Sequence, residues 1–281
     1  MDKKKAFDRS DLKEFEPEAK VGLISTINPE GLPHLTLITA LQAKGTKQLI
    51  WGQFTEGMSK KNVMSNPNTA FLIMTMDKNL WRGKAIYTHK AREGEDYEMF
   101  NKKPMFRYNC YCGIHTVYYM DLVETYGREK LPLAKIVMSS LFTMASRSRA
   151  KTNLPDPILK PWAYKVFNRL DSLKFLSYID DDGFPVIIPL IQGQASDSRR
   201  LAFSPYAYKD ELSSLENGKS VVVFALTLDM EDILTRGIFR GFERYNGVKL
   251  GTIDIDWVYN SMPPKQGQIY PMEELSPVVN F

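Results

Sequence analysis

A hairpin-like segment occurs twice in this chain of 281 residues, at positions 152 apart. The first copy, VGLISTINPEGLP, begins at Val21, and the second, LKFLSYIDDDGFP, begins at Leu173. In both copies an apolar run leads into a turn that ends in glycine, and a proline follows two positions later. Apolar runs on either side of such a turn predict a β-hairpin. A pattern that returns at a constant offset predicts two copies of one domain in tandem.

The segments after each hairpin come in the same order, which is strand, helix, strand and strand. In the first copy we expect strands at 48–54, 69–75 and 79–90, with the helix before 66. In the second copy we expect strands at 186–192, 200–204, 220–226 and 233–243, with a helix at 209–217. Asn66–Pro67 must end the first helix, because a residue before proline is pushed out of the helical conformation. The order predicts a mainly β fold with a few helices.

The helix of the first copy carries Ser59, Lys60 and Lys61 close to the end of a strand. A hydroxyl group, two ammonium groups and helical N–H groups together suit a phosphate. The alternative is a solvated basic turn, which is the commoner interpretation of an isolated Ser-Lys-Lys, because most lysines lie on protein surfaces.

Three motifs in this order resemble the pyridoxamine 5′-phosphate oxidase-like family of FMN-binding split β-barrels. They are ISTINPEGLPH at 24–34, LIWG at 49–52 and SKKNVMSNP at 59–67. The resemblance covers about the first 100 residues. It implies an α+β fold class, mainly β with α, of two tandem split β-barrels that form an intramolecular pseudo-dimer.

A helical connection separates the two copies. Leu133–Ala145 has apolar residues at helical spacing, prolines follow at 155, 157 and 161, and a second amphipathic helix is expected from Trp162 to Leu170. We expect Met138 and Met144 to pack into the core. The predicted domains are therefore a barrel at 1–127, a helical linker at 128–172 and a second barrel at 173–281.

The resemblance also implies which residues hold the FMN. The isoalloxazine ring would lie along the first barrel's strands, and the phosphate would lie at the basic helix. The second barrel would supply the far wall of the site. The implied cofactor-binding residues are Thr36, Ile38, Thr39, Trp51, Gly52, Gln53, Ser59, Lys60, Lys61, Trp81 and Arg236. One position departs from the family pattern, because Ser59 stands where the family has its lysine. No catalytic residue is identified.

The corresponding helix of the second copy has acids in place of the lysines. Asp210, Glu211 and Glu216 would repel a phosphate dianion, and Lys209 alone remains as a cation there. The sequence therefore predicts one competent site and one silent site.

The composition of the chain limits the classes of partner that we expect. With 37 basic against 33 acidic residues the net charge is only +4, which does not indicate a nucleic-acid partner. No run of apolar residues is long enough for a membrane span, and the first residues lack the apolar core of a signal peptide, so we expect a cytoplasmic protein without membrane contact. Cys110, Cys112 and His115 form an incomplete metal-ligand set, and we predict buried thiols and no metal.

Two hypotheses of function remain open. In the first, the protein is an FMN-dependent oxidoreductase that acts on a small molecule and takes electrons from a nicotinamide or another donor. In the second, it binds a flavin or haem without turnover, or it is a scaffold that has lost its cofactor. The choice among FMN, another flavin and a deazaflavin is also open, as is further association of the pseudo-dimer into a homodimer.

Overall fold

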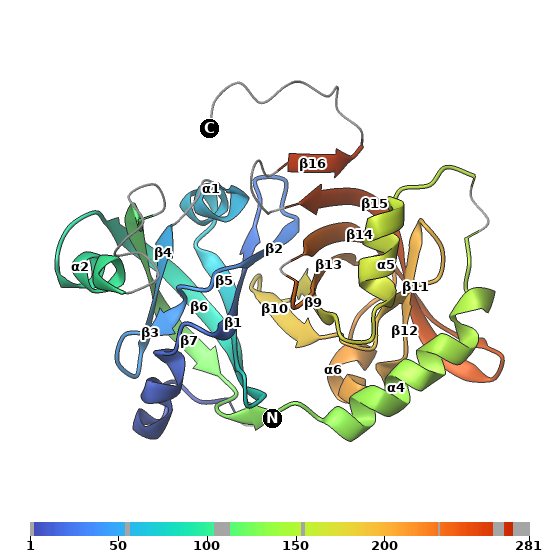
Figure 1. Ribbon diagram of the computed structural model, residues 1–281, viewed down its shortest axis with the longest axis horizontal. Helices are drawn as coiled ribbons and strands as arrows, with labels where there is room; N and C mark the ends of the chain where they lie inside the picture. The colour runs from blue at the N-terminus through green and yellow to red at the C-terminus, as the bar shows by residue number, and fades with distance from the viewer. Residues whose placement is uncertain are drawn as a thin grey trace. The chain divides into compact units, whose positions relative to one another are not determined.

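The computed structural model describes residues 3–53, 57–103, 113–152, 155–229, 231–260 and 267–271 (Figure 1). The chain divides into two compact units. The first comprises Met1–Leu131 together with Ile179–Ile187, and the second comprises Pro132–Tyr178 together with Ile188–Phe281. The helices of the predicted linker thus belong to the second unit.

The first unit is built on one antiparallel sheet. Its strands are β1 (Lys20–Ile27), β2 (Pro33–Leu37), β3 (Gln42–Ala43), β4 (Gln48–Gln53), β5 (Asn68–Thr75), β6 (Asn79–Ala91), β7 (Thr116–Thr125) and β8 (Glu129–Lys130). Its helices are the 3-10 helix η1 (Arg9–Phe15), α1 (Met58–Ser65) and α2 (Glu95–Lys102). The order of the strands across the sheet is β2-β1-β5-β6-β7-β4-β3, with β8 paired to β6.

A second sheet, most of which belongs to the second unit, repeats this arrangement. Its strands are β9 (Leu173–Ile179), β10 (Pro185–Pro189), β11 (Gln194–Ala195), β12 (Arg200–Phe203), β13 (Ser220–Leu226), β14 (Asp232–Tyr245), β15 (Val248–Asn260) and β16 (Gly267–Tyr270). They are arranged in the order β10-β9-β13-β14-β15-β12-β11, with β16 paired to β15. Strand for strand this is the order of the first sheet. The predicted fold class, mainly β with α and two tandem split-barrel-like domains, is confirmed.

The two predicted hairpins form as expected. β1 pairs with β2 and β9 pairs with β10, in each case around a turn with a left-handed glycine. Gly31 has φ 75° and Gly183 has φ 78°, a conformation that costs other L-residues energy. The turn explains why each copy keeps its glycine.

The turn of the second hairpin makes its contacts inside the first unit. The Lys84 side chain is almost fully buried and donates to Asp180 Oδ2 at 2.9 Å and to Asp182 Oδ2 at 2.6 Å. Asn68 Nδ2 donates to the carbonyl oxygen of Gly183 at 3.1 Å. Two carboxylates thus compensate one buried ammonium, which is the condition under which a charge can be buried.

The helices of the second unit are α4 (Leu133–Ser146), η2 (Arg147–Arg149), α5 (Pro161–Asn168), η3 (Pro205–Tyr208) and α6 (Lys209–Ser213). α4 buries Ser139, Thr143 and Ser146 and leaves Met138 and Met144 about half exposed. The expectation that these methionines are core residues is wrong. Helical spacing shows which residues share a face, but it does not show which face turns inward.

Helix α6 is shorter than predicted and ends at Ser213. No helix in the described parts of the chain combines the length and the apolar character that a membrane crossing needs. Cys110 and Cys112 lie outside the described residues. Within the described ranges no cluster of three or more His, Cys, Asp or Glu side chains is placed to hold a metal ion.

Candidate functional site

Three neighbouring strands of the first unit present polar side chains on one face. β7 lies between β4 and β6, with Gln53 opposite Thr116, and with both Trp51 and Lys90 opposite Tyr118. Directly opposed residues of an antiparallel pair point to the same side, and so do residues two apart along a strand. The register therefore brings these five side chains to one face of the sheet.

The aromatic pair on this face is rigidly held. The rings of Trp51 and Tyr118 stack with their centres 4.2 Å apart at an interplanar angle of 11°. The Tyr118 hydroxyl donates to Gln53 Oε1 at 3.1 Å. Trp51 is fully buried, and its indole N–H has no hydrogen-bond partner among the described residues. Tyr118 is thus fixed between a ring below it and an amide at its hydroxyl end.

Helix α1 supplies the lysines. It begins at Met58 after Gly57, and it ends before Asn66, whose backbone is extended, as the following proline predicts. Asn62 Nδ2 donates to Thr26 Oγ1 of β1 at 2.9 Å, which fastens the helix to the sheet. Along the helix Lys60 is buried and Lys61 is exposed, so the two ammonium groups leave α1 in different directions.

A pocket of about 410 Å³ lies where α1 meets the ends of these strands. We call it the basic pocket, and its lining residues are Gln53, Lys60, Lys61, Met64, Lys90, Arg92, His115, Thr116 and Tyr118. Four of these residues are permanent cations and none is acidic. A cavity lined by charges of one sign raises the local concentration of the opposite ion. The basic pocket therefore favours an anion, and its lysine, arginine, amide and hydroxyl donors suit a phosphate.

Of the residues predicted for the phosphate, Lys60 and Lys61 line the basic pocket and Ser59 does not. Ser59 is fully buried, and its hydroxyl has no hydrogen-bond partner in the described part of the chain. Lys60 and Lys61 leave the short helix in different directions, and both still line this one pocket.

Of the residues predicted along the isoalloxazine, Gln53 lines the pocket and Trp51 supports it through Tyr118. Gly52 faces the other way. A Cβ atom on Gly52 would lie 2.7 Å from the Ile114 side chain, so this glycine makes room for an apolar contact on the opposite face.

The structure places Thr36, Ile38 and Thr39 at or just after β2, and none of them lines the basic pocket. Ile38 is buried in the core of the first unit. The Thr36 hydroxyl is buried and makes no hydrogen bond to a described residue. These three positions are not brought together with the lysines of α1 in this pocket.

Trp81 belongs to the core. It is fully buried, its indole N–H donates to Asp11 Oδ2 at 2.8 Å, and its ring packs edge-on against Phe15. Its polar atom and its ring face are both used by the protein itself. The residue therefore has a complete structural role, which strand character alone did not reveal.

Arg236 lies in the second unit on β14. Its guanidinium group pairs with Asp256 at 3.4 Å and lies 5.2 Å from the centre of the Trp257 ring. An arginine with a carboxylate and an aromatic face as neighbours is electrostatically compensated within its own unit.

Six residues of the basic pocket were not predicted to bind the cofactor, namely Met64, Lys90, Arg92, His115, Thr116 and Tyr118. Lys90 and Arg92 stand two apart at the end of β6, and in the sequence they look like ordinary solvated charges. Their spacing could have indicated a shared role, because two cations that are two residues apart at the end of a strand point to the same face of the sheet.

No family model matches this chain, and no curated protein matches it in sequence. Among solved structures, it is similar to a putative pyridoxamine 5′-phosphate oxidase from Lactobacillus delbrueckii, with 12% identity and a TM-score of 0.36 over 45% of this chain and 99% of the other. An FMN-binding protein from Syntrophomonas wolfei matches with 13% identity and a TM-score of 0.34 over 41% and 80% of the two chains. HupZ from group A Streptococcus matches with 14% identity and a TM-score of 0.34 over 41% and 90%.

Proposed function

We propose that the first unit binds FMN, with the phosphate group in the basic pocket, and that the protein is a flavin-dependent oxidoreductase. The observation that carries the proposal is the convergence of Lys60, Lys61, Lys90 and Arg92 on one pocket whose described lining contains no carboxylate. The sequence motifs that resemble the FMN-binding split-barrel family support the same cofactor.

The donor set fits a phosphate monoester. Such a group carries a charge of about −1.5 to −2 at neutral pH and offers three acceptor oxygens. Arg92 can contact two of these oxygens through its planar fork, while the lysines act as point charges. Thr116 and His115 add further polar side chains at the start of β7. The charge of the pocket exceeds that of the ligand, so binding should weaken as the salt concentration rises.

The protein's share of the chemistry is binding and orientation. FMN supplies the redox chemistry when it is bound. The stacked Trp51 and Tyr118 rings and the Tyr118–Gln53 hydrogen bond hold the sheet face in place beneath the pocket. A rigid face keeps the phosphate anchor at a constant position, which is what a cofactor site requires.

Comparison of FMN with riboflavin tests the binding. Riboflavin has the same ring system without the phosphate, so we expect it to bind at least about 100-fold more weakly, the loss of two charge-assisted hydrogen bonds. Fluorescence titration of the purified protein measures both constants. Lys60→Glu/Lys61→Glu should abolish FMN binding, and Lys209→Glu in the second unit should leave it unchanged. Equal affinities for the two flavins, or a damaging Lys209→Glu change, would overturn the proposal.

The oxidoreductase activity rests on the family resemblance and needs its own test. Bleaching of the bound flavin's absorbance by a nicotinamide donor under anaerobic conditions would support it. Flavin that binds but accepts electrons from neither nicotinamide coenzyme would favour the flavin-binding protein without turnover.

A further inference from the structure

Helix α4 turns its polar side inward and its apolar side outward. It lies in the second unit, where it packs beside β12 and η3 (Figure 1). Its inward side carries the hydroxyl groups of Ser139, Thr143 and Ser146, which are buried. Seven of its eight exposed residues are apolar, and Lys135 is the eighth. This is the reverse of an ordinary surface helix, whose apolar stripe faces the core.

The orientation of α4 is fixed by hydrogen bonds of its hydroxyl side. Thr143 Oγ1 accepts from the backbone N–H of Ser204 at 2.9 Å and donates to the carbonyl oxygen of Ser139 at 2.8 Å. Ser204 directly follows β12, so the first bond ties the hydroxyl side of the helix to the sheet. Rotation of α4 to bury its apolar side would leave the buried N–H of Ser204 without this acceptor. The apolar side therefore stays on the outside.

Five large apolar side chains form this outer side, and we call them the α4 patch. Each of them is between 44% and 57% exposed, and they are Leu133, Val137, Met138, Leu141 and Met144. Their spacing of three and four residues places them on one side of the helix. Tyr206 of η3, 49% exposed, adds a ring that packs edge-on against Phe142 with ring centres 6.0 Å apart. A contiguous apolar surface of this kind marks an interaction site.

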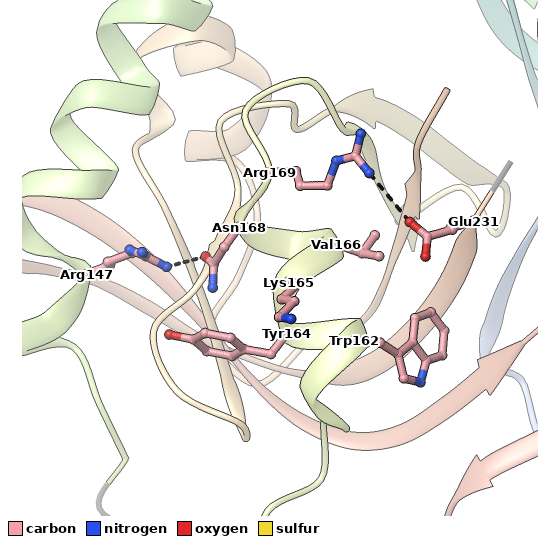
Figure 2. A pocket seen from close by; sticks show the side chains of 8 residues that line it. All are labelled: Arg147, Trp162, Tyr164, Lys165, Val166, Asn168, Arg169 and Glu231. Carbon is pink, nitrogen blue, oxygen red and sulfur yellow. Dashed lines mark hydrogen bonds and ion pairs between the residues drawn. The ribbon is translucent and has the colours of Figure 1, made fainter. Parts of the chain in front are cut away.

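The charges on the segment that contains α4 are all positive. Between Pro132 and Pro155 the sequence has four basic residues and no acidic one. Lys135, Arg149 and Lys151 are exposed, and their side chains make no ion pair or hydrogen bond within the described ranges. The fourth, Arg147, is turned toward the Asn168 amide of α5 (Figure 2). Three cations beside the α4 patch are thus left without a counterion among the described residues.

The elements that pack on α4 do not neutralise these cations. Neither η2, η3 nor β12 contains an acidic residue, and β15 contributes two aspartates. Asp254 pairs with Arg200 at 2.6 Å and with Arg240 at 2.8 Å. Asp256 pairs with Arg236 at 3.4 Å. Both carboxylates are therefore already compensated by arginines of their own sheet.

An apolar stripe with basic residues beside it is complementary to an anionic lipid surface. A second copy of the chain is a poorer match, because two α4 helices in contact would bring the same cations into one interface, and like charges there oppose binding. The α4 patch is also only one helix wide, whereas a stable dimer buries about 800 Å² on each partner.

We propose that α4 binds the surface of membranes that contain anionic lipids. The α4 patch enters the boundary between headgroups and acyl chains, and Lys135, Arg149 and Lys151 contact the lipid phosphates. Composition predicted no membrane contact because no apolar run is long enough to span a bilayer, but a helix that lies in the interface needs no spanning length. The surface is independent of the flavin site proposed for the first unit.

Co-sedimentation of the full chain with lipid vesicles tests the proposal. Vesicles of equal parts phosphatidylcholine and phosphatidylglycerol should bind at least about tenfold more strongly than vesicles of phosphatidylcholine alone, because each cation gains from the anionic surface. Binding should weaken as the salt concentration rises. The Lys60→Glu/Lys61→Glu variant must bind the mixed vesicles as the wild type does, which excludes the basic pocket as the lipid site.

Two matched pairs of variants locate the contact. Leu141→Gln removes an apolar side chain from the α4 patch and should weaken binding several-fold, whereas Leu228→Gln, the same change at a leucine that is 76% exposed on the turn before β14, should not. Lys135→Gln should weaken binding to the mixed vesicles several-fold, whereas Lys160→Gln, at an exposed lysine before α5, should not. All four positions are exposed, so we expect each variant to keep the wild-type urea midpoint.

Absence of binding to the mixed vesicles, equal binding to both kinds of vesicle, or equal effects within either pair would overturn the proposal. Sedimentation velocity without lipid identifies the other occupant. A dimer that Leu141→Gln dissociates and Leu228→Gln does not, in a protein that ignores vesicles, would show that a second copy covers the α4 patch.

Discussion

The two copies share their strand order and differ where the first copy forms its basic pocket. In each sheet the same three neighbouring strands carry three facing side chains. They are Trp51, Tyr118 and Lys90 in the first sheet and Phe203, Gly251 and Phe242 in the second. One set combines an aromatic stack with a cation, and the other is apolar throughout.

In the second copy, aromatic rings take the place of the pocket. A Cβ atom on Gly251 would lie 2.7 Å from both Phe203 and Phe242, so the glycine makes room for the two rings. Phe239 packs edge-on against Phe242 with ring centres 5.1 Å apart. The acidic residues of α6 are therefore only part of the difference. At the three facing positions the second copy carries no charge and its rings fill the space, while the order of the strands is the same in both copies.

The largest expected effect is on the aromatic stack of the first copy. Tyr118→Ala removes a buried ring from Trp51 and leaves a cavity, which should lower the free energy of unfolding by about 3–5 kcal/mol. Gly251→Ala adds a methyl group where two phenylalanine rings leave no space, and this overpacking should lower the free energy of unfolding by about 1–3 kcal/mol. Urea unfolding followed by circular dichroism measures both. If the Tyr118→Ala protein is as stable as the wild type, Tyr118 and Gly251 do not play equivalent roles in the packing of their two sheets.

Exchange of one facing residue tests the charge difference. Lys90→Phe introduces the second copy's side chain into the basic pocket and should raise the FMN dissociation constant by about 100-fold. Lys209→Phe, a change of the same kind on α6, is the control and should have no effect. If Lys90→Phe binds FMN normally, the cations of β6 are not part of the phosphate site.

A third position contrasts a glycine with a buried lysine. Gly22 of β1 and Lys174 of β9 face the equivalent residues Ile73 and Ala225. Lys174 Nζ donates to the carbonyl oxygens of Arg169, Ser172 and Ile191, and burial lowers the pKa of Lys174 from 10.5 to about 7.

This shift predicts a pH dependence of stability. Between about pH 7 and 10.5 the unfolded chain binds more protons at this lysine than the folded chain does, so the free energy of unfolding should rise with pH across that window. Lys174→Met should flatten this rise, and the exposed Lys209→Met should not. Urea midpoints at pH 7, 8.5 and 10 provide the measurement. An unchanged slope in Lys174→Met would mean that the ammonium stays charged on its three carbonyl oxygens.

The smallest expected effects are at the turns that the copies share. Gly31→Ala and Gly183→Ala each force a left-handed conformation on an L-residue and should cost about 1 kcal/mol. Because φ differs by only 3° between the two glycines, the two costs should agree. Unequal costs in thermal unfolding would indicate that contacts of the turn, such as that between Asn68 and Gly183, contribute as well.

Much of the fold was predictable because its signals are local. The alternation of apolar residues, the Asn-Pro that ends α1 and the left-handed glycines each act within a few residues. β15 was not predicted, although it is the central neighbour of β14 and β12, because its register with them joins residues distant in sequence. The orientation of α4, with its hydroxyls inward, was not predictable for a related reason, because helical periodicity is the same for either face.

The sequence by itself determined the duplication, the hairpins and the lysines of α1, since each is written in a short run of residues. Only the tertiary structure decided that Lys90 and Arg92 join Lys60 and Lys61, that Gly52 and Trp81 serve packing, and that Phe242 packs over Gly251 in the second copy. The physical reason is that an antiparallel register sets distant residues side by side, and burial then decides which of them pack in the core and which line a pocket.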